Sequence, residues 1–364
     1  MKKEESEKVE MIFKSTITQK ISLTIFALFL SAPFSFISAQ TVEVEPNIVK
    51  PRIVIAPVKQ KFKRKYKKVT SESQTPAEKS IAVDAKVNIQ LCVSEGNLKI
   101  TGWERNEIRA FVNNGSEVGF NVREKNKQSN KAVWVKVLGF DPTKNKETNL
   151  DECLSGEEIE LDVPRGATLN VRGQTSETII ESVGRVSVEI GGGDIFLSGI
   201  ERGIEAKVYE GDVTVGKSGG AMTLTSTTGN IVAFDVAPSG IGDIFKAKTS
   251  SGAITLQSIE HRQIEIGSNS GSMKFVGEFL SGGQYTFGTL NGSILLAIPQ
   301  NSSCKINASF GRGAFNSALP LLNVVKNATS KTQSLSALMG SGDATLNLTT
   351  YSGAIRIKKV KNEK

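Results

Sequence analysis

The sequence predicts an all-β protein whose larger part is a single-stranded β-solenoid, expected to be right-handed, with irregular strands at its N-terminal end. Apolar and polar residues alternate at period two in many short segments. A short unit that begins with glycine recurs at nearly constant spacing. Glycine is abundant, with 34 residues, and aromatic residues make up only 6%. This composition favours a narrow core of Val, Ile and Leu with tight corners.

Residues 1–39 are predicted to be a signal peptide. Lys20 precedes the uncharged apolar stretch Ile21–Leu30, and small residues follow, with a candidate cleavage position at Ala39. The apolar stretch is shorter than the roughly 20 residues that span a bilayer, which favours a removed signal. The longer stretch Ile21–Ala39 keeps an uncleaved anchor as the alternative. We therefore expect an exported protein that is periplasmic, at the cell surface or secreted.

Residues 40–80 are predicted to be a disordered, Pro-containing basic tether. The net charge of +8 arises mainly in residues 50–68, because the charges from residue 81 onward nearly balance. This segment has no acid and nine basic residues: Lys50, Arg52, Lys59, Lys61, Lys63, Arg64, Lys65, Lys67 and Lys68. We expect a solvated linker, with contact between this segment and an anionic surface as the alternative. Nucleic acid is not expected, since no folded face carries the charge.

Residues 81–168 are predicted to form short strands that cap the solenoid. Ile81–Leu91 alternates cleanly at period two, and shorter alternating segments follow, separated by turns rich in Gly, Asn and Lys. The last of these strands ends at the turn Pro164-Arg165-Gly166. No segment of the body has convincing helical periodicity, and Leu319–Leu338 is the most ambiguous part.

Residues 169–360 are predicted to be the repetitive solenoid. The unit is glycine, a small polar residue, then apolar-x-apolar, as in Gly193-Asp194-Ile195-Phe196-Leu197. It recurs at Gly211, Gly229, Gly252, Gly271, Gly292, Gly342 and Gly353. Each unit is too short to bury its own apolar face. We therefore expect coils stacked about 4.8 Å apart, with Ile195, Val213 and Ile231 in one buried column. A β-sandwich or barrel is the alternative, although neither requires this repeat.

Three motifs resemble the DUF4097 family of bacterial, adhesin-like β-solenoid proteins. Gly96–Ile108 (GNLKITGWERNEI) resembles the opening motif of that family. Asp162–Leu169 (DVPRGATL) is similar to the strand-Pro-Gly entry into its coils, and Asn291–Pro299 is a later copy of that device. The resemblance covers about residues 81–359. It implies a solenoid-like fold, a location in the envelope or outside the cell, and no enzymatic activity.

Few residues are candidates for chemistry. His261 is the only histidine, and its polar surroundings predict a solvated turn residue. Asp194, Asp212 and Asn230 share one position of successive units, so they are expected to form a ladder. A weak Ca²⁺ site there is conceivable, but capping of local backbone groups is the favoured interpretation. The segment 141–152 superficially fits an EF-hand loop, yet Lys146 stands where glycine is required.

The three cysteines do not have the spacing of a metal site. Cys92 and Cys153 either pair in an oxidising compartment or, with Cys304, remain buried thiols. We therefore predict no catalytic residue, no cofactor-binding residue and no metal site. The predicted function is a non-catalytic, exported, adhesin-like binding or scaffold module of the cell envelope. Its partner is expected to be an unidentified envelope protein or glycan. The alternative is a β-helix enzyme that acts on polysaccharide.

Overall fold

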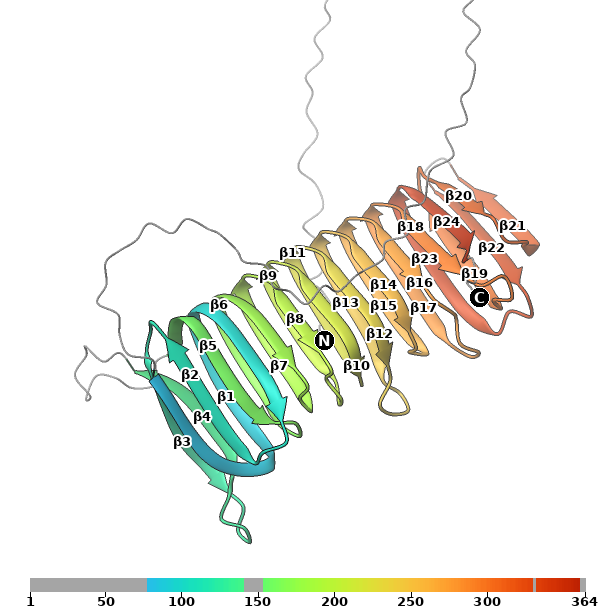
Figure 1. Ribbon diagram of the computed structural model, residues 1–364. Helices are drawn as coiled ribbons and strands as arrows, with labels where there is room; N and C mark the ends of the chain where they lie inside the picture. The colour runs from blue at the N-terminus through green and yellow to red at the C-terminus, as the bar shows by residue number, and fades with distance from the viewer. Residues whose placement is uncertain (1–76, 141–152, 330–331, 361–364) are drawn as a thin grey trace, which may run out of the picture. The chain divides into compact units, whose positions relative to one another are not determined.

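The computed structural model describes residues 77–140, 153–329 and 332–360, which contain 24 strands and no helix (Figure 1). The predicted signal peptide and most of the predicted tether lie outside these residues. Strand β1 (Ala77–Trp103) begins before the predicted end of the tether, so residues 77–80 belong to a strand instead. These four residues pair with β2 (Glu107–Asn113). The tether therefore ends earlier than its composition indicated.

Each coil contributes one strand to each of two stacks, and equivalent strands of successive coils pair in parallel (Figure 1). Stack A continues from β6 (Thr168–Glu181) through β7 (Arg185–Gly192), β9 (Ile204–Glu210), β11 (Met222–Thr228), β13 (Ile244–Ser251), β15 (Gln263–Ser270) and β17 (Gln284–Asn291). Stack B continues from β6 through β8 (Ile195–Ser198), β10 (Val213–Gly219), β12 (Ile231–Ala237), β14 (Ile254–Ile259), β16 (Met273–Val276) and β18 (Ile294–Ile298). The predicted β-solenoid is confirmed.

The core consists of apolar columns that run between the two stacks. Val213 pairs with Ile195 on one side and with Ile231 on the other, and all three side chains are fully buried. The predicted column is therefore confirmed. It continues through Ile254, Met273, Ile294 and Ile355. Like side chains stacked at the inter-strand spacing bury apolar surface that no single coil could cover.

A column of glycines forms the corner between the stacks. Gly229 has a φ of 151°, and a Cβ at this position would overlap the carbonyl oxygen of Gly211 in the preceding coil. That carbonyl accepts a hydrogen bond from Ser226 Oγ at 2.9 Å, and the carbonyl of Gly229 accepts one from Thr249 Oγ1 at 2.9 Å. Glycine is required here because neighbouring backbones approach too closely for any side chain.

The N-terminal part and the repeats share one core. Strands β1 and β6 are long because each passes through both stacks and pairs with the other along most of its length. Strand β6 therefore crosses the predicted boundary between the N-terminal strand region (residues 81–168) and the solenoid (residues 169–360). Beyond β1, stack A continues with β4 (Ala132–Phe140) and ends at the antiparallel strand β3 (Glu117–Lys125). Stack B continues on the same side of β1 with β5 (Leu154–Pro164) and ends at the antiparallel strand β2.

A disulfide joins Cys92 in β1 to Cys153, which directly precedes β5. The sequence left this pairing open. The bond ties the first coil to the strand that covers it. It also closes a loop of 61 residues in the unfolded chain, which favours the folded state by reducing chain entropy.

The C-terminal coil lies out of sequence order in the stack. Strands β23 (Ala344–Ser352) and β24 (Ala354–Lys359) pair with β17 and β18 on one side, and with β19 (Cys304–Phe310) and β20 (Ala314–Ser317) on the other. The prediction that Gly342 begins a repeat is therefore wrong, because Ala344 to Leu346 belong to stack A. Gly313, which the sequence analysis missed, takes the corner position against Gly353.

An antiparallel hairpin ends stack A at the C-terminal side. Strand β22 (Gln333–Met339) pairs with β19, and β21 (Leu322–Ala328) pairs with β22, so the ambiguous segment Leu319–Leu338 is largely strand. All residues of β21 are exposed. Its pairing is interrupted by an irregularity at Asn323, and Lys326 lies opposite the buried Leu335. A bulge and a lysine are features that discourage further pairing at an edge strand.

Candidate functional site

The outward face of stack A, called face A, carries paired charges and small polar side chains. Lys207 Nζ lies 2.7 Å from Glu189 Oε1, and Lys246 and Lys248 both contact Glu265. The hydrogen bond from Lys207 lowers the pKa of Glu189, and the hydrogen bond from Lys248 lowers the pKa of Glu265. Face A is defined by two outward columns: Asn170, Ser187, Glu205, Thr223, Lys246, Glu265, Thr286, Asn347 and Asn307; and Arg172, Glu189, Lys207, Thr225, Lys248, Gly267, Gly288, Thr349 and Ser309.

The outward face of stack B, called face B, is different in composition. Its half-buried apolar side chains are Ile179, Phe196, Val232, Phe234, Val276, Leu295 and Ala297. Two columns define it: Ile179, Phe196, Thr214, Val232, Thr255, Lys274, Leu295, Arg356 and Asn316; and Glu181, Ser198, Gly216, Phe234, Gln257, Val276, Ala297 and Lys358. The two columns of face A have no large apolar member, and the exposed Tyr209 and Leu290 lie outside them, two residues beyond Lys207 in β9 and Gly288 in β17. The two faces therefore differ in the partner that each can accept.

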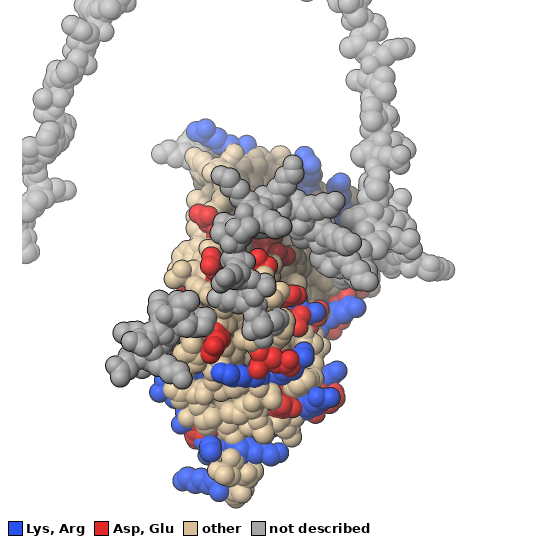
Figure 2. Space-filling view, turned by 60° about the vertical axis from the view of Figure 1, so that its left-hand side comes forward, with Lys and Arg blue, Asp and Glu red and all other residues tan. Residues whose placement is uncertain are grey.

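The surface near the N-terminal end shows the mixed character of the charges. In Figure 2, which brings the side with β1 to β5 forward, acidic and basic side chains lie beside one another over the visible surface. Arg109 contributes here, because its Nη2 lies 2.5 Å from Asp162 Oδ2 and its Nη1 lies 3.6 Å from Glu78 Oε1. Paired surface charges keep a protein soluble but give little attraction for a charged partner.

The predicted ladder of Asp194, Asp212 and Asn230 is present, and it binds backbone. Asp194 Oδ1 accepts a hydrogen bond from the N–H of Asp212 at 2.8 Å, and Asp212 Oδ1 accepts one from the N–H of Asn230 at 2.7 Å. Asn230 Oδ1 in turn accepts from the N–H of Ala253 at 2.9 Å. Each side chain therefore links its coil to the next coil, whereas we expected capping within one corner. No group of three or more His, Cys, Asp or Glu side chains suited to a metal occurs within the described residues.

His261 is fully buried, so the prediction of a solvated turn residue is wrong. Its Nε2 lies 2.9 Å from the carbonyl oxygen of Gly220, and its ring meets Phe245 edge-on at 5.8 Å. The chain between β12 and β13 projects outward (Figure 1), with Ile241 fully exposed near its tip. The histidine thus reaches past the intervening coil to a carbonyl two coils away. The polar neighbours of His261 in the sequence gave no signal of this contact.

We expect His261 to make stability depend on pH. Burial lowers the pKa of His261 against the opposing effects of the Gly220 hydrogen bond and of Asp243 and Glu260. Because the folded state disfavours the charged ring, stability is complete above the unfolded pKa of about 6.5 and falls as the pH decreases below it, by up to about 1.4 kcal/mol per unit. Urea unfolding between pH 7.5 and about 5 would measure this slope.

His261→Gln is the matched variant, since its amide N–H can still donate to Gly220 while the side chain does not titrate. Its free energy of unfolding should vary less between these pH values than that of the wild type. An equal slope in both proteins would show that His261 is not the titrating group.

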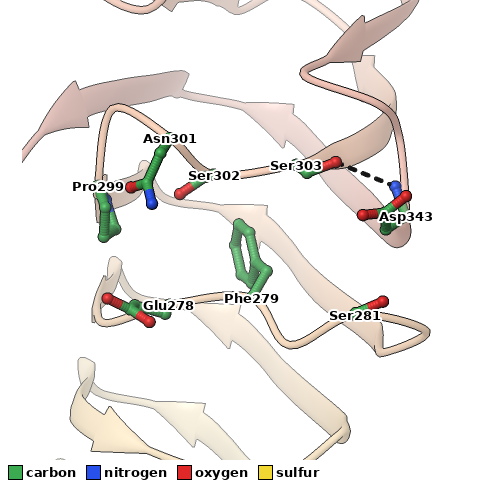
Figure 3. A pocket seen from close by; sticks show the side chains of 8 residues that line it. All are labelled: Glu278, Phe279, Ser281, Pro299, Asn301, Ser302, Ser303 and Asp343. Carbon is green, nitrogen blue, oxygen red and sulfur yellow. Dashed lines mark hydrogen bonds between the residues drawn. The ribbon is translucent and has the colours of Figure 1, made fainter.

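One hollow of about 150 Å³ opens between the loops at the C-terminal half of the stack. Figure 3 shows Glu278 and Asp343 on opposite sides of it, with Phe279 between them. The ring of Phe279 is largely buried, because it stacks on Phe275 at 5.3 Å and packs against Tyr285 at 4.6 Å. The other lining residues are Ser281, Pro299, Asn301, Ser302 and Ser303.

The remaining candidate residues give no reactive centre. Cys304 is buried in β19, and burial raises the pKa of its thiol to about 11. A thiol of this kind is a poor nucleophile at neutral pH. The segment with EF-hand-like spacing, residues 141–152, lies outside the described residues. No helix within the described part of the chain is long and apolar enough to cross a membrane.

A family model described as Toastrack DUF4097 matches residues 69–358 of the chain. The chain belongs to the Toastrack DUF4097 family. The resemblance found in the three sequence motifs is therefore confirmed. No curated protein matches this Toastrack chain.

Solved structures similar to this Toastrack chain match most of its length at low sequence identity. One is a "putative cell adhesion protein" from Clostridium sporogenes, with 14% identity, a TM-score of 0.19 and coverage of 79% of this chain and 100% of the other. A "putative adhesin" from Parabacteroides merdae has 10% identity, a TM-score of 0.29 and coverage of 79% and 96%. A "putative lipid binding protein" from Parabacteroides distasonis has 12% identity, a TM-score of 0.28 and coverage of 79% and 97%.

Proposed function

We propose that this Toastrack chain is a non-catalytic binding or scaffold module of the cell envelope, exported and adhesin-like, which docks other envelope components on face B. The contrast between the two faces carries this proposal. On face A the three lysines Lys207, Lys246 and Lys248 form ion pairs with Glu189 or Glu265. Face B instead presents apolar side chains in columns, among them Phe196 and Val232, on a flat sheet.

A flat, partly apolar face suits recognition of an extended partner. Neighbouring side chains in a column are about 4.8 Å apart, so the apolar members of face B recur along the stack with only one or two small or polar side chains between them in most places. Apolar side chains gathered on a solvent-facing sheet mark interaction surfaces in soluble proteins, even where each is only half-exposed. The ladder hydrogen bonds of Asp194 and Asp212 fix the spacing of the coils, which keeps the face rigid before binding.

An enzyme that acts on polysaccharide is the alternative function. It would need a groove with facing carboxylates, and the hollow near Phe279 has Glu278 and Asp343 on opposite sides (Figure 3). The largely buried ring of Phe279 lies between the two carboxylates, so the hollow gives this alternative little support.

The proposal predicts that face B is needed for retention on the envelope. The double variant Phe196→Gln with Val232→Gln should bind a sedimented envelope fraction from the producing cell roughly tenfold more weakly or worse, because it removes two apolar contacts. The matched control is Thr223→Gln with Thr225→Gln on face A, which should bind as the wild type does. Thermal melting of each variant verifies folding. Equal binding by all three proteins would refute face B as the docking surface.

A further inference from the structure

The C-terminal third of face B combines cations with apolar side chains in a regular pattern. Lys274, Leu295 and Arg356 follow one another in the first column, and Val276, Ala297 and Lys358 in the second. We call these six residues the basic-apolar patch. The patch contains no acidic side chain. Glu278 lies beyond the corner at Gly277 and lines the hollow instead.

The cations of the patch differ from those of face A in their partners. None of Lys274, Arg356 and Lys358 forms an ion pair with a carboxylate of the described residues, whereas Lys246 and Lys248 share Glu265. Arg356 and Lys358 are exposed. Their charge is therefore available to an anionic partner without first breaking an ion pair.

One apolar member, Leu295, lies between two cations. Leu295 pairs with Lys274 on one side and with Arg356 on the other, so the two charges are about 10 Å apart with an apolar side chain between them. In the second column, Ala297 lies between the apolar Val276 and the cation Lys358. A purely polyanionic partner would gain nothing from Leu295 and Val276, whereas the boundary between lipid headgroups and acyl chains offers both phosphate and hydrocarbon.

From this arrangement we infer that the basic-apolar patch binds the surface of a membrane containing anionic phospholipid. The inference rests on the proposed function and specifies the component that this part of face B contacts. Lys274 and Arg356 contact the lipid phosphates, while Leu295 and Val276 contact the boundary between the headgroups and the acyl chains. The basic segment 50–68, with nine Lys and Arg residues, lies outside the described residues and is not part of this patch.

The test uses the full chain and phosphatidylcholine vesicles with and without phosphatidylglycerol, in a cosedimentation assay. The wild type should bind only the vesicles with phosphatidylglycerol, and less at high salt. Lys274→Gln with Arg356→Gln should weaken binding roughly 30-fold, since each of the two cations contributes a factor of about five near an anionic surface. Thr255→Lys, which extends the first column by one cation, should strengthen binding.

The control Lys246→Gln with Lys248→Gln changes the net charge by the same amount on face A. It should bind nearly as the wild type does, and an equal loss in both double variants would overturn the inference in favour of net charge alone. Deleting residues 50–68 from each protein separates the contribution of that segment. If the chain ignores phosphatidylglycerol but still requires Phe196 and Val232 on envelope fractions, the lipid inference fails, the proposed function stands, and the partner is a protein or glycan.

Discussion

Replacing Val213 by Asp should destabilise the solenoid by about 4 kcal/mol or more. Val213 is fully buried between Ile195 and Ile231, and no described basic side chain reaches that column. A carboxylate there loses its hydration and gains no partner, or takes up a proton at a similar cost. Such buried charges are among the largest single-residue effects on stability. Ile195→Asp should behave alike, because it occupies the adjacent rung. Urea unfolding followed by circular dichroism would measure both.

Thr214→Asp is the control for this prediction. Thr214 is adjacent in the chain, lies in the same strand and points outward on face B. The same substitution there should change stability by less than about 1 kcal/mol. If both variants unfold at the same urea concentration, the assignment of inward and outward positions in stack B is wrong.

The repeated glycine unit was sufficient to predict the solenoid and its buried column. The unit places Ile195, Val213 and Ile231 at one position, and only stacking of coils can bury all of them. The order of the last coils could not be predicted. Residues 304–317 and 344–359 both fit the coil pattern, and the sequence has no local signal for which of them stacks on β17 and β18. That choice depends on contacts between distant segments.

The candidate site was predicted less completely than the fold. Face B was missed because Ile231-Val232-Ala233-Phe234 is an apolar run without alternation, which hides the outward members Val232 and Phe234. Such a run is the signal that could have revealed an apolar outer face. His261 was assigned to solvent because its neighbours in the sequence are polar. Its burial results from Gly220 and Phe245, which lie 41 and 16 positions away and which no local pattern connects to it.

Replacing Gly229 by Ala should destabilise the protein by about 3 kcal/mol or more, although it adds only one methyl group. The φ of 151° is a conformation that L-residues rarely adopt. The new Cβ would also overlap the carbonyl oxygen of Gly211, which already accepts the hydroxyl of Ser226. The backbone must therefore move, and its movement disturbs the contacts with both neighbouring coils. Thermal unfolding of the variant would show the loss as a lower melting temperature.

Gly288→Ala provides a control of opposite sign. Gly288 lies within β17 on face A, outside the left-handed region of φ, and a Cβ there would have no atom within 4 Å. Alanine should stabilise this strand by about 0.5 kcal/mol, because it reduces the conformational freedom of the unfolded chain. The same chemical change thus gives opposite effects at a corner and on a face. Two effects of equal sign and size would contradict the close approach of successive coils at the glycine column, on which the spacing of both faces depends.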